Sequence, residues 1–390
     1  MILPRRRLLG LAAAAGAAAG CSAGPPEPAA SSAPPDSPAT AASTPTAPGP
    51  PSASSPNAPE SASPTPAATG LGDPTAEEVV TGLRSPWGLI PLRDGSFLVS
   101  ERDTAEIVVV ADGRSRRVGT VGDAEPYVEG GLLGIAASAD QETLFAYFTA
   151  ADDNRIVRMR WDGRRIGDQQ VVLSGIPKGA RHNGGRMIIG PDDLLYVSTG
   201  ETGDPDLAQD RDSPAGKILR ITPDGDPAPG NPFGNEVFSY GHRNVQGLVF
   251  DPQGRLWASE FGDQQTDELN LIEAGGNYGW PEVEGAGGAD GMIDPVVEWS
   301  PAEASPSGLT FWKGSFYLAA LRGERLWEVP LTDPDAGRVG EPRAHFTGEY
   351  GRLRSVEVSA DGEALLVLTN NTDGRTRPRD GDDRLLRITR

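Results

Sequence analysis

Apolar residues along this chain recur mainly at every second position, in short runs that end at Gly, Pro or Asp. This period is typical of β-strands, whose successive side chains point to opposite faces, and not of helices. A turn followed by an apolar strand occurs six times, at intervals of about 50 to 60 residues. The six copies are residues 94–101, 140–149, 191–200, 252–260, 313–320 and 361–369.

Each copy predicts a unit of four antiparallel strands. A Gly-rich apolar segment precedes the copy, as in "WGLIPL" (87–92), and another strand follows it, as in "EIVVV" (106–110). Five units show a weaker fourth strand, whereas the sixth ends with the chain and can take its fourth strand from "EEVVTGL" (77–83). We therefore expect an all-β fold, a six-bladed β-propeller of four-stranded antiparallel blades. A β-sandwich with accidental internal similarity is the alternative.

Residues 1–21 have the layout of an export signal, with a basic start and an apolar Leu/Ala/Gly run too short for a convincing membrane span. Cys21 is the only cysteine in the chain, and the small residues before it are like the lipobox of bacterial lipoproteins. We expect a lipid on Cys21 that anchors the exported protein to the outer side of the cytoplasmic membrane. The alternative is an ordinary cleaved signal and a secreted protein. "RRRLL" (5–9) fits a twin-arginine signal, and the general export route stays open.

Residues 22–76 are rich in Pro, Ala, Ser and Thr, without any aromatic residue, Lys or Arg. Such a segment buries too little apolar surface to offset its ordering entropy, so we expect a disordered linker. Residues 77–390 then form a single propeller domain. The net charge of −20 argues against a nucleic-acid partner and is typical of a solvated exported protein.

Unusual polar residues share one position when the six units are aligned. The first strand of each propeller blade lines the central channel, so the residues just before it lie at one mouth of that channel. A histidine in unit three falls in register with an arginine in unit four, and an asparagine follows each. Unit six adds two arginines and unit two adds a glutamate. The residues expected to converge are Glu129, His182, Asn183, Arg243, Asn244, Arg352 and Arg354.

These residue types together indicate an anion pocket that contains a base. Guanidinium groups bind carboxylates through two parallel hydrogen bonds, and an imidazole exchanges a proton near neutral pH. Taken singly, an arginine at a strand end is more often part of a surface ion pair, and a histidine in "HNGG" is more often a turn residue. The shared register favours the pocket. We expect the other two histidines, His242 and His345, to be structural.

Residues 259–281, "SEFGDQQTDELNLIEAGGNYGWP", combine carboxylates with Gly-rich turns. Hard oxygen ligands on flexible backbone suit calcium, but the spacing of an EF-hand is absent. From the residues alone, a solvated acidic turn is therefore the simpler interpretation. Residues 200–216 form a second acidic loop, which we expect to shape the mouth of the pocket.

Five motifs, in this order, resemble those of the soluble pyrroloquinoline-quinone (PQQ) sugar dehydrogenases, and especially the bacterial aldose sugar dehydrogenase branch. They are "GGLLGIA" (130–136), "RHNGGRM" (181–187), "GHRNVQGL" (241–248), "DELNLIEAGGNYGWP" (267–281) and "GRLRSV" (351–356). The resemblance covers essentially all of residues 77–390. It implies a six-bladed propeller that binds its quinone over the channel mouth.

The resemblance also implies roles for individual residues. His182 is the general base, and Arg243 and Arg322 complete the catalytic set, with Arg322 where the glucose enzymes have a lysine. Cofactor contacts are implied for Glu129, Arg243, Asn244, Arg322, Arg352 and Arg354. The backbone carbonyls of Gly262 and Asp263 match the catalytic calcium site of the glucose enzymes, and Glu268 and Tyr278 match a structural calcium site of the aldose branch.

Three residues depart from the pattern of the glucose enzymes. Arg181 replaces an acidic residue that orients the histidine, so either the base is weaker or another group orients it. Glu129 replaces a glutamine and brings an acid close to an anionic cofactor, which requires Arg322 or a metal nearby. Phe261 replaces a polar cofactor contact.

The reaction implied by the resemblance is oxidation of an aldose at C1 to a lactone. His182 removes the proton of the C1 hydroxyl while a hydride passes from C1 to the quinone, calcium polarises the quinone, and Arg322 stabilises the developing oxyanion. The electron acceptor stays open between a quinone, a cytochrome and, in vitro, a dye. One alternative is a lactonase-type hydrolase, which needs carboxylates where the inner strands here have mainly arginines. The other is a non-catalytic propeller that binds a carbohydrate or a protein outside the cell.

Overall fold

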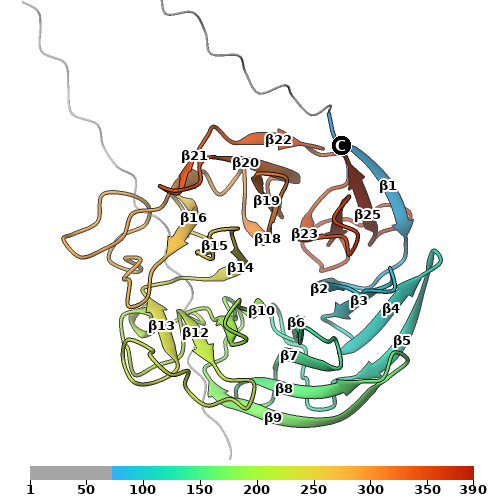
Figure 1. Cartoon of the computed structure of the whole chain (residues 1–390), viewed down its shortest axis with the longest axis horizontal. Coiled ribbons are helices and arrows are strands. Elements are labelled where there is room, and N and C mark those ends of the chain that lie inside the picture. Colours follow the sequence, from blue (N-terminus) through green and yellow to red (C-terminus); the bar gives the residue numbers. More distant parts are fainter. Residues whose placement is uncertain (1–72) are drawn as a thin grey trace, which may run out of the picture. The chain divides into compact units, whose positions relative to one another are not determined.

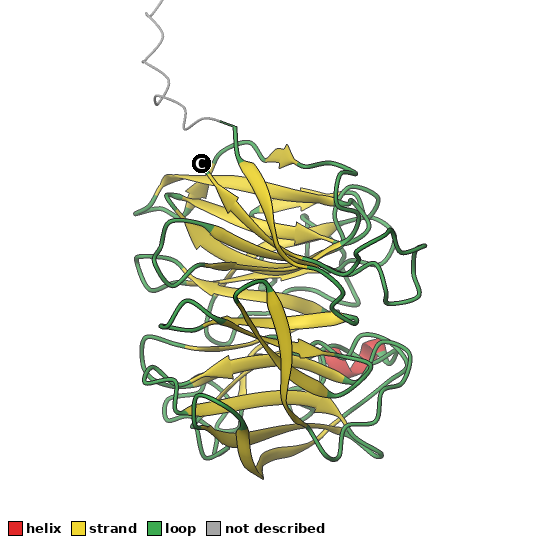
Figure 2. Ribbon diagram, turned by 90° about the vertical axis from the view of Figure 1, so that its right-hand side faces the viewer, coloured by secondary structure: helices red, strands yellow, loops and turns green. Residues whose placement is uncertain are grey.

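Six antiparallel sheets surround a central axis in the computed structural model, which describes residues 73–390 (Figure 1). Each repeated unit forms one sheet, which confirms the predicted six-bladed propeller. The export signal, Cys21 and nearly all of the linker lie outside the described residues. Within residues 73–390 the only helix is the short 3-10 helix Pro205–Ala208 (Figure 2), so none is long and apolar enough to cross a membrane.

In the first five blades the strands follow the chain from the axis outwards, and in the sixth the outermost strand is β1 (Thr75–Val80). The innermost strands are β2 (Pro86–Pro91), β6 (Leu132–Ala137), β10 (Met187–Ile189), β14 (Val245–Phe250), β18 (Pro306–Trp312) and β23 (Leu353–Val358). The second strands are β3 (Phe97–Glu101), β7 (Thr143–Thr149), β11 (Leu195–Ser198), β15 (Leu256–Glu260), β19 (Ser315–Ala320) and β24 (Leu365–Thr369). These second strands end the six turn-and-strand copies seen in the sequence.

The third strands are β4 (Glu106–Ala111), β8 (Asn154–Trp161), β12 (Lys217–Ile221), β16 (Asp267–Ile272), β20 (Arg325–Asp333) and β25 (Leu385–Thr389). The outer strands of the first five blades are β5 (Arg114–Thr120), β9 (Ile166–Ile176), β13 (Val237–Tyr240), β17 (Val297–Trp299) and β22 (Arg343–His345). The fifth blade has an additional short strand, β21 (Arg338–Val339), which also pairs with β20.

Apolar side chains pack between neighbouring blades and form the core. Trp257 of the fourth blade packs against Phe316 of the fifth, with 4.4 Å between the ring centroids. Close approach of the inner strands explains why β2, β6, β14 and β18 contain glycine. A Cβ atom on Gly134 of β6 would lie 2.0 Å from the carbonyl oxygen of Gly185, which leads into β10. The inner strands therefore pack backbone to backbone and bring the residues that precede them close together.

The sixth blade is completed from the other end of the chain, as predicted. Strand β1 (Thr75–Val80) pairs antiparallel with β25, from Thr75 opposite Thr389 to Val80 opposite Leu385. It begins at Thr75, so two residues of the segment assigned to the linker belong to the blade. The pairing continues beyond the strand, because the backbones of Leu83 and Asp383 exchange hydrogen bonds of 3.0 and 3.1 Å.

We expect the ring to depend on strand β1. A chain that begins at residue 73 keeps this strand, whereas a chain that begins at residue 81 loses its ladder and leaves the edge of β25 unpaired. Each lost backbone hydrogen bond is worth about 1 kcal/mol, so the free energy of unfolding should fall by about 4 kcal/mol. Urea unfolding of the two chains measures this difference, and equal stabilities would contradict the role of β1.

Candidate functional site

A cavity of about 290 Å³ lies at the end of the channel where the inner strands begin. Residues from all six blades or their connecting loops line it. Six of the seven residues expected from the shared register line it, namely Glu129, His182, Arg243, Asn244, Arg352 and Arg354, as does Arg322, which the resemblance added. The other lining residues are Trp87, Arg102, Gln246, Phe261, Ser305, Leu321, Asp373 and Arg375. The prediction for Asn183 is wrong: it is buried away from the cavity, where its Oδ1 accepts from Asn154 and from the backbone of Gly179. The structure thus gathers the candidate base and the candidate cations around one space.

His182 is held in an uncommon backbone conformation just ahead of β10. Its φ is +54°, a left-handed value that histidine adopts more readily than most residues. The carbonyl of His182 accepts a hydrogen bond of 3.1 Å from the backbone of Thr202. A Cβ on Gly200 would lie 2.0 Å from that carbonyl oxygen, so only glycine fits opposite the histidine. The run of small residues around "HNGG" therefore sets the position of the imidazole.

Glu201 orients the imidazole of His182. The Nδ1 atom of His182 contacts Glu201 Oε1, and both side chains are nearly buried. The other carboxylate oxygen of Glu201 accepts from the backbone of Gly203. A carboxylate on Nδ1 fixes the proton there, which leaves Nε2 as the basic nitrogen for the cavity that His182 lines. Arg181, in place of the acidic residue of the glucose enzymes, predicts either a weaker base or another group that orients the histidine. Glu201 is that other group.

Glu129 is neutralised by a cation that the sequence did not suggest. Its Oε1 pairs with the guanidinium of Arg375, which comes from the loop between β24 and β25. Its Oε2 accepts a hydrogen bond of 3.1 Å from the backbone N–H of His182. Arg322 lines the same cavity but is not the ion-pair partner. Through these two contacts, Glu129 links the backbone of His182 to Arg375 of the sixth blade.

Arg243 connects the cavity with the loop that follows β15. Its Nη1 donates to the carbonyl of Gly262, and its Nη2 lies 2.7 Å from Asp263 Oδ1. A hydrogen bond from Gln264 and the charge of Arg243 hold the pKa of Asp263 below its usual value. The guanidinium also lies 5.3 Å from the ring centroid of Trp280. Nε of Arg243 is buried and has no hydrogen-bond partner within residues 73–390.

Arg352 and Arg354 share one carboxylate, that of Asp373. Nη2 of Arg352 lies 3.2 Å from Asp373 Oδ2, and Nη2 of Arg354 lies 3.9 Å from the same atom. Arg354 also donates to Gln246 Oε1 over 2.8 Å. Burial lowers the pKa of Arg354 to about 9. Nε of Arg352 is buried without a partner in the described part of the chain, as is Nε of Arg243, so two donors at this cavity are unsatisfied.

Glu284 organises the loop that carries Gly262 and Asp263. Its Oε1 accepts hydrogen bonds from four successive backbone N–H groups, those of residues 263–266, over 2.6 to 3.0 Å. From the other side, Asp267 Oδ1 accepts from the backbone of Gly262 over 2.9 Å. Two carboxylates therefore fix the direction of the Gly262 carbonyl.

The other two predicted calcium residues lie apart from the cavity. Glu268 accepts hydrogen bonds of 2.9 Å from Gly285 and from the Nδ2 atom of Asn270. Burial and the neighbouring carboxylate of Glu260 raise the pKa of Glu268. The Oδ1 atom of Asn270 is buried with no partner among the described residues. Tyr278 instead uses its hydroxyl to bond the backbone at Leu271 and Glu273.

His242, expected to be structural, is fully buried. Its ring stacks on that of Tyr278 with 4.6 Å between centroids, and it bonds Ser239 and Glu260 over 2.8 Å each. His345 lies in the outer strand β22 and bonds Glu328 over 2.8 Å. Within residues 73–390, no group of three or more His, Cys, Asp or Glu side chains is arranged to hold a metal ion.

Known proteins share both the sequence and the fold. The sequence model described as Glucose / Sorbosone dehydrogenase matches residues 83–386. This chain belongs to the glucose/sorbosone dehydrogenase family. A PQQ-bound aldose sugar dehydrogenase from Streptomyces coelicolor is 53% identical, covers 81% of this chain and 98% of its own, and has a TM-score of 0.78. An aldose sugar dehydrogenase from Escherichia coli is 28% identical over 75% of this chain and 89% of its own. Quinoprotein glucose dehydrogenase B from Acinetobacter calcoaceticus is 32% identical over 53% of this chain and 52% of its own.

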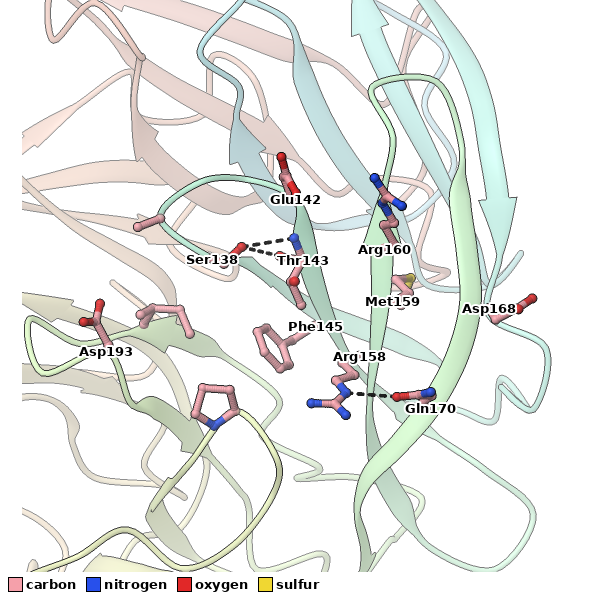
Figure 3. Close-up of a pocket in the computed structure, with 13 residues that line it drawn as sticks. Ser138, Glu142, Thr143, Phe145, Arg158, Met159, Arg160, Asp168, Gln170 and Asp193 are labelled. Atoms are coloured by element: carbon pink, nitrogen blue, oxygen red, sulfur yellow. Dashed lines mark hydrogen bonds between the residues drawn. The ribbon is translucent and has the colours of Figure 1, made fainter.

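The protein has a second cavity, of about 540 Å³, between the second and third blades (Figure 3). It is lined at one side by Phe145 and Met159 and at the other by the β10–β11 turn with Asp193. Its Arg158 is already engaged with Gln170 and Asp224. This cavity contains none of the residues that converge on His182, so we assign the site to the channel mouth.

Asp267 makes the loop beneath Arg243 sensitive to pH. Burial raises the pKa of its carboxyl to about 6 from 3.8, so between these values the folded state holds a proton that the unfolded state releases. The stabilisation is present below pH 3.8 and is lost as the pH rises through 6. Relative to Asp267→Asn, the free energy of unfolding of the unmodified protein should therefore fall by about 3 kcal/mol between pH 3.5 and 7.

Urea unfolding at several pH values tests this expectation. Asp290→Asn, at an exposed position of a nearby loop, serves as the matched control and should follow the unmodified protein at every pH. A constant difference between Asp267→Asn and the unmodified protein, or one that grows with pH, would show that the buried carboxyl does not hold this proton.

Proposed function

We propose that this protein is a PQQ-dependent dehydrogenase that oxidises aldose sugars at C1 to lactones. The observation that carries the proposal is a single cavity that joins a carboxylate-oriented histidine to several guanidinium groups. Membership of the glucose/sorbosone dehydrogenase family supports it, as does the similarity to the PQQ-bound enzyme of Streptomyces coelicolor.

The donors at the cavity suit a quinone with three carboxylates. Arg243 and Arg352 each have a buried Nε without a partner in the described residues, which a bound anion would satisfy. Arg322 is exposed at the lip, and Arg354 lies deeper, next to Trp87. Guanidinium groups bind carboxylates through charge-assisted and often paired hydrogen bonds, which are stronger than those between neutral groups. We assign the cofactor contacts to these four arginines together with Glu129 and Asn244.

The resemblance offers two positions for calcium, and the residues fit them unequally. Beside the cavity, Gly262 and Asp263 lie on a loop fixed by Glu284, but the Gly262 carbonyl accepts from the guanidinium of Arg243, a cation that calcium would have to displace. Away from it, the carboxylate of Glu268 and the unsatisfied Oδ1 of Asn270 supply oxygen ligands of the kind that calcium prefers. The first would hold the metal as a Lewis acid beside the cofactor. The second would hold it as part of the fold, with Tyr278 as the further ligand that the family resemblance implies.

The protein's own residues provide the proton chemistry. Nε2 of His182 takes the proton of the sugar C1 hydroxyl, and the carboxylate of Glu201 stabilises the imidazolium that results. Arg322, at the lip, stabilises negative charge that develops on oxygen. The bound quinone supplies the two-electron acceptor for the hydride that leaves C1. His182 thus acts as the base, Glu201 and Arg322 stabilise the charges that develop, and the cofactor would accept the electrons.

We further propose that the enzyme acts outside the cytoplasmic membrane. The basic and apolar character of residues 1–21 supports export, and the small residues before Cys21 support a lipid anchor there. The electrons then pass to an acceptor on that side of the membrane, either a quinone or a cytochrome.

Quinone titration followed by absorbance tests the cofactor assignment. We expect the purified protein to bind PQQ with a saturable spectral change that strengthens when calcium is added. Arg352→Met removes a charge-assisted donor worth about 1.5–3 kcal/mol, so affinity should fall about 10- to 100-fold. Arg114→Met, on an exposed outer strand, should leave affinity unchanged. A protein that shows no spectral change would be a binding module or a hydrolase instead.

Dye reduction with aldoses tests the proton chemistry. His182→Ala should lower kcat by about 10²- to 10⁴-fold while PQQ still binds, because only the base is lost. Glu201→Gln should lower kcat less, since the ring keeps its Nε2 but loses the ion that stabilises its protonated form. Glu282→Gln, an exposed acid, is the control. Full activity of His182→Ala would remove the histidine from the mechanism.

A further inference from the structure

Two consecutive apolar side chains stand exposed near the channel mouth. Within residues 73–390, the large hydrophobic side chains with the greatest exposure are Tyr127 at 61%, Val128 at 58% and Val171 at 51%. Val171 belongs to the outer strand β9, away from the mouth. Single exposed apolar residues need no explanation, but an adjacent pair beside a site of chemistry is a candidate contact surface.

The turn that carries this pair is tight and strained. Tyr127 and Gly130 exchange two backbone hydrogen bonds, of 3.3 and 2.8 Å, so Val128 and Glu129 are the residues at its tip. Val128 has a φ of +53°, where a β-branched residue is an outlier. Strained backbone persists where the surroundings over-determine it, and it concentrates at functional sites. Here the strained turn leaves the side chains of Tyr127 and Val128 exposed.

The turn is also locked to the candidate base. The backbone of Glu129 donates to the carbonyl of Ala180 over 3.2 Å, and its carboxylate accepts from the backbone N–H of His182 over 3.1 Å. The same carboxylate pairs with Arg375. Tyr127 is two residues from Glu129, so their Cα atoms are at most about 7 Å apart. The backbone of Tyr127 is thus held close to Glu129, which lines the cavity.

We propose that the Tyr127–Val128 turn is a subsite for the second ring of a disaccharide or longer saccharide whose reducing end is oxidised at His182. This inference rests on the proposed sugar oxidation. A sugar ring has an apolar face that stacks on an aromatic side chain, and hydroxyl groups that bond planar polar groups. The turn carries both, namely the exposed ring of Tyr127 and, two residues on, the carboxylate of Glu129, which pairs with the partly exposed guanidinium of Arg375.

The size of the patch favours a sugar over a protein. Stable protein interfaces bury about 1,200 Å² or more, with several apolar anchors at their centre. Tyr127 and Val128 are neighbours on one turn, and the remaining exposed large hydrophobic residues of the described chain, Val171 and Val296, lie on or beside the outer strands β9 and β17. A patch of two side chains is comparable in size to one sugar ring and is far smaller than a protein interface.

Steady-state kinetics of Tyr127→Ala with glucose and maltose tests the subsite. We expect kcat/KM for maltose to fall about 5- to 10-fold, through KM, while the value for glucose stays within twofold. Tyr127→Phe keeps the ring face and should retain maltose activity. Val171→Ala is the control on another exposed apolar side chain, at 51%, and should change kcat/KM for neither substrate. PQQ titration should be the same for all variants.

The outcomes separate this inference from the proposed function. An unmodified protein that binds PQQ but oxidises neither sugar contradicts the proposed function, and the subsite falls with it. If the unmodified protein oxidises both sugars and Tyr127→Ala changes neither, or lowers both equally, the subsite alone is wrong. A selective loss for maltose that Tyr127→Phe restores supports it.

Discussion

The antiparallel pairing of β1 with β25 is the contact on which the rest of this structure depends. A propeller blade buries its two faces only against its neighbours, so an open ring would expose two faces and one strand edge. Joining the ends of the chain in one sheet fixes the six inner strands around a common axis. No single blade forms the cavity, since each blade contributes only one or a few of the side chains that line it.

A concentration of positive charge at the channel mouth is the second constraint. Arg186 and Arg354 are both buried near Trp87, with their guanidinium carbons 4.3 and 5.8 Å from its ring centroid. Burial lowers the pKa of Arg186 to about 10 and that of Arg354 to about 9. Few carboxylates are close, chiefly Asp373 and Glu357. Buried cations in excess of anions cost folding free energy, which a bound anionic ligand recovers.

The amino-acid sequence is sufficient to predict the fold and those site residues that precede the inner strands. Residues that precede inner strands repeat in register, so alignment of the copies is enough to place His182 and Arg243 together. Glu201, Asp373 and Arg375 follow the second strands of their blades, in loops of unequal length, and no register relates them. Their approach to the cavity depends on how each loop folds back, which periodicity does not encode. The acidic loop after residue 200 is evident from its composition, but no sequence pattern connects its first carboxylate with the histidine.

The hairpin of β10 and β11 carries both members of the histidine–glutamate pair, since His182 precedes the one strand and Glu201 follows the other. The guanidinium groups that face the cavity come from other blades, Arg243 before β14 and Arg352 at β23. In the proposed mechanism, proton transfer and anion binding therefore belong to separate repeats. A change confined to the β10–β11 hairpin would therefore alter the histidine–glutamate pair and leave the arginines of the other blades in place.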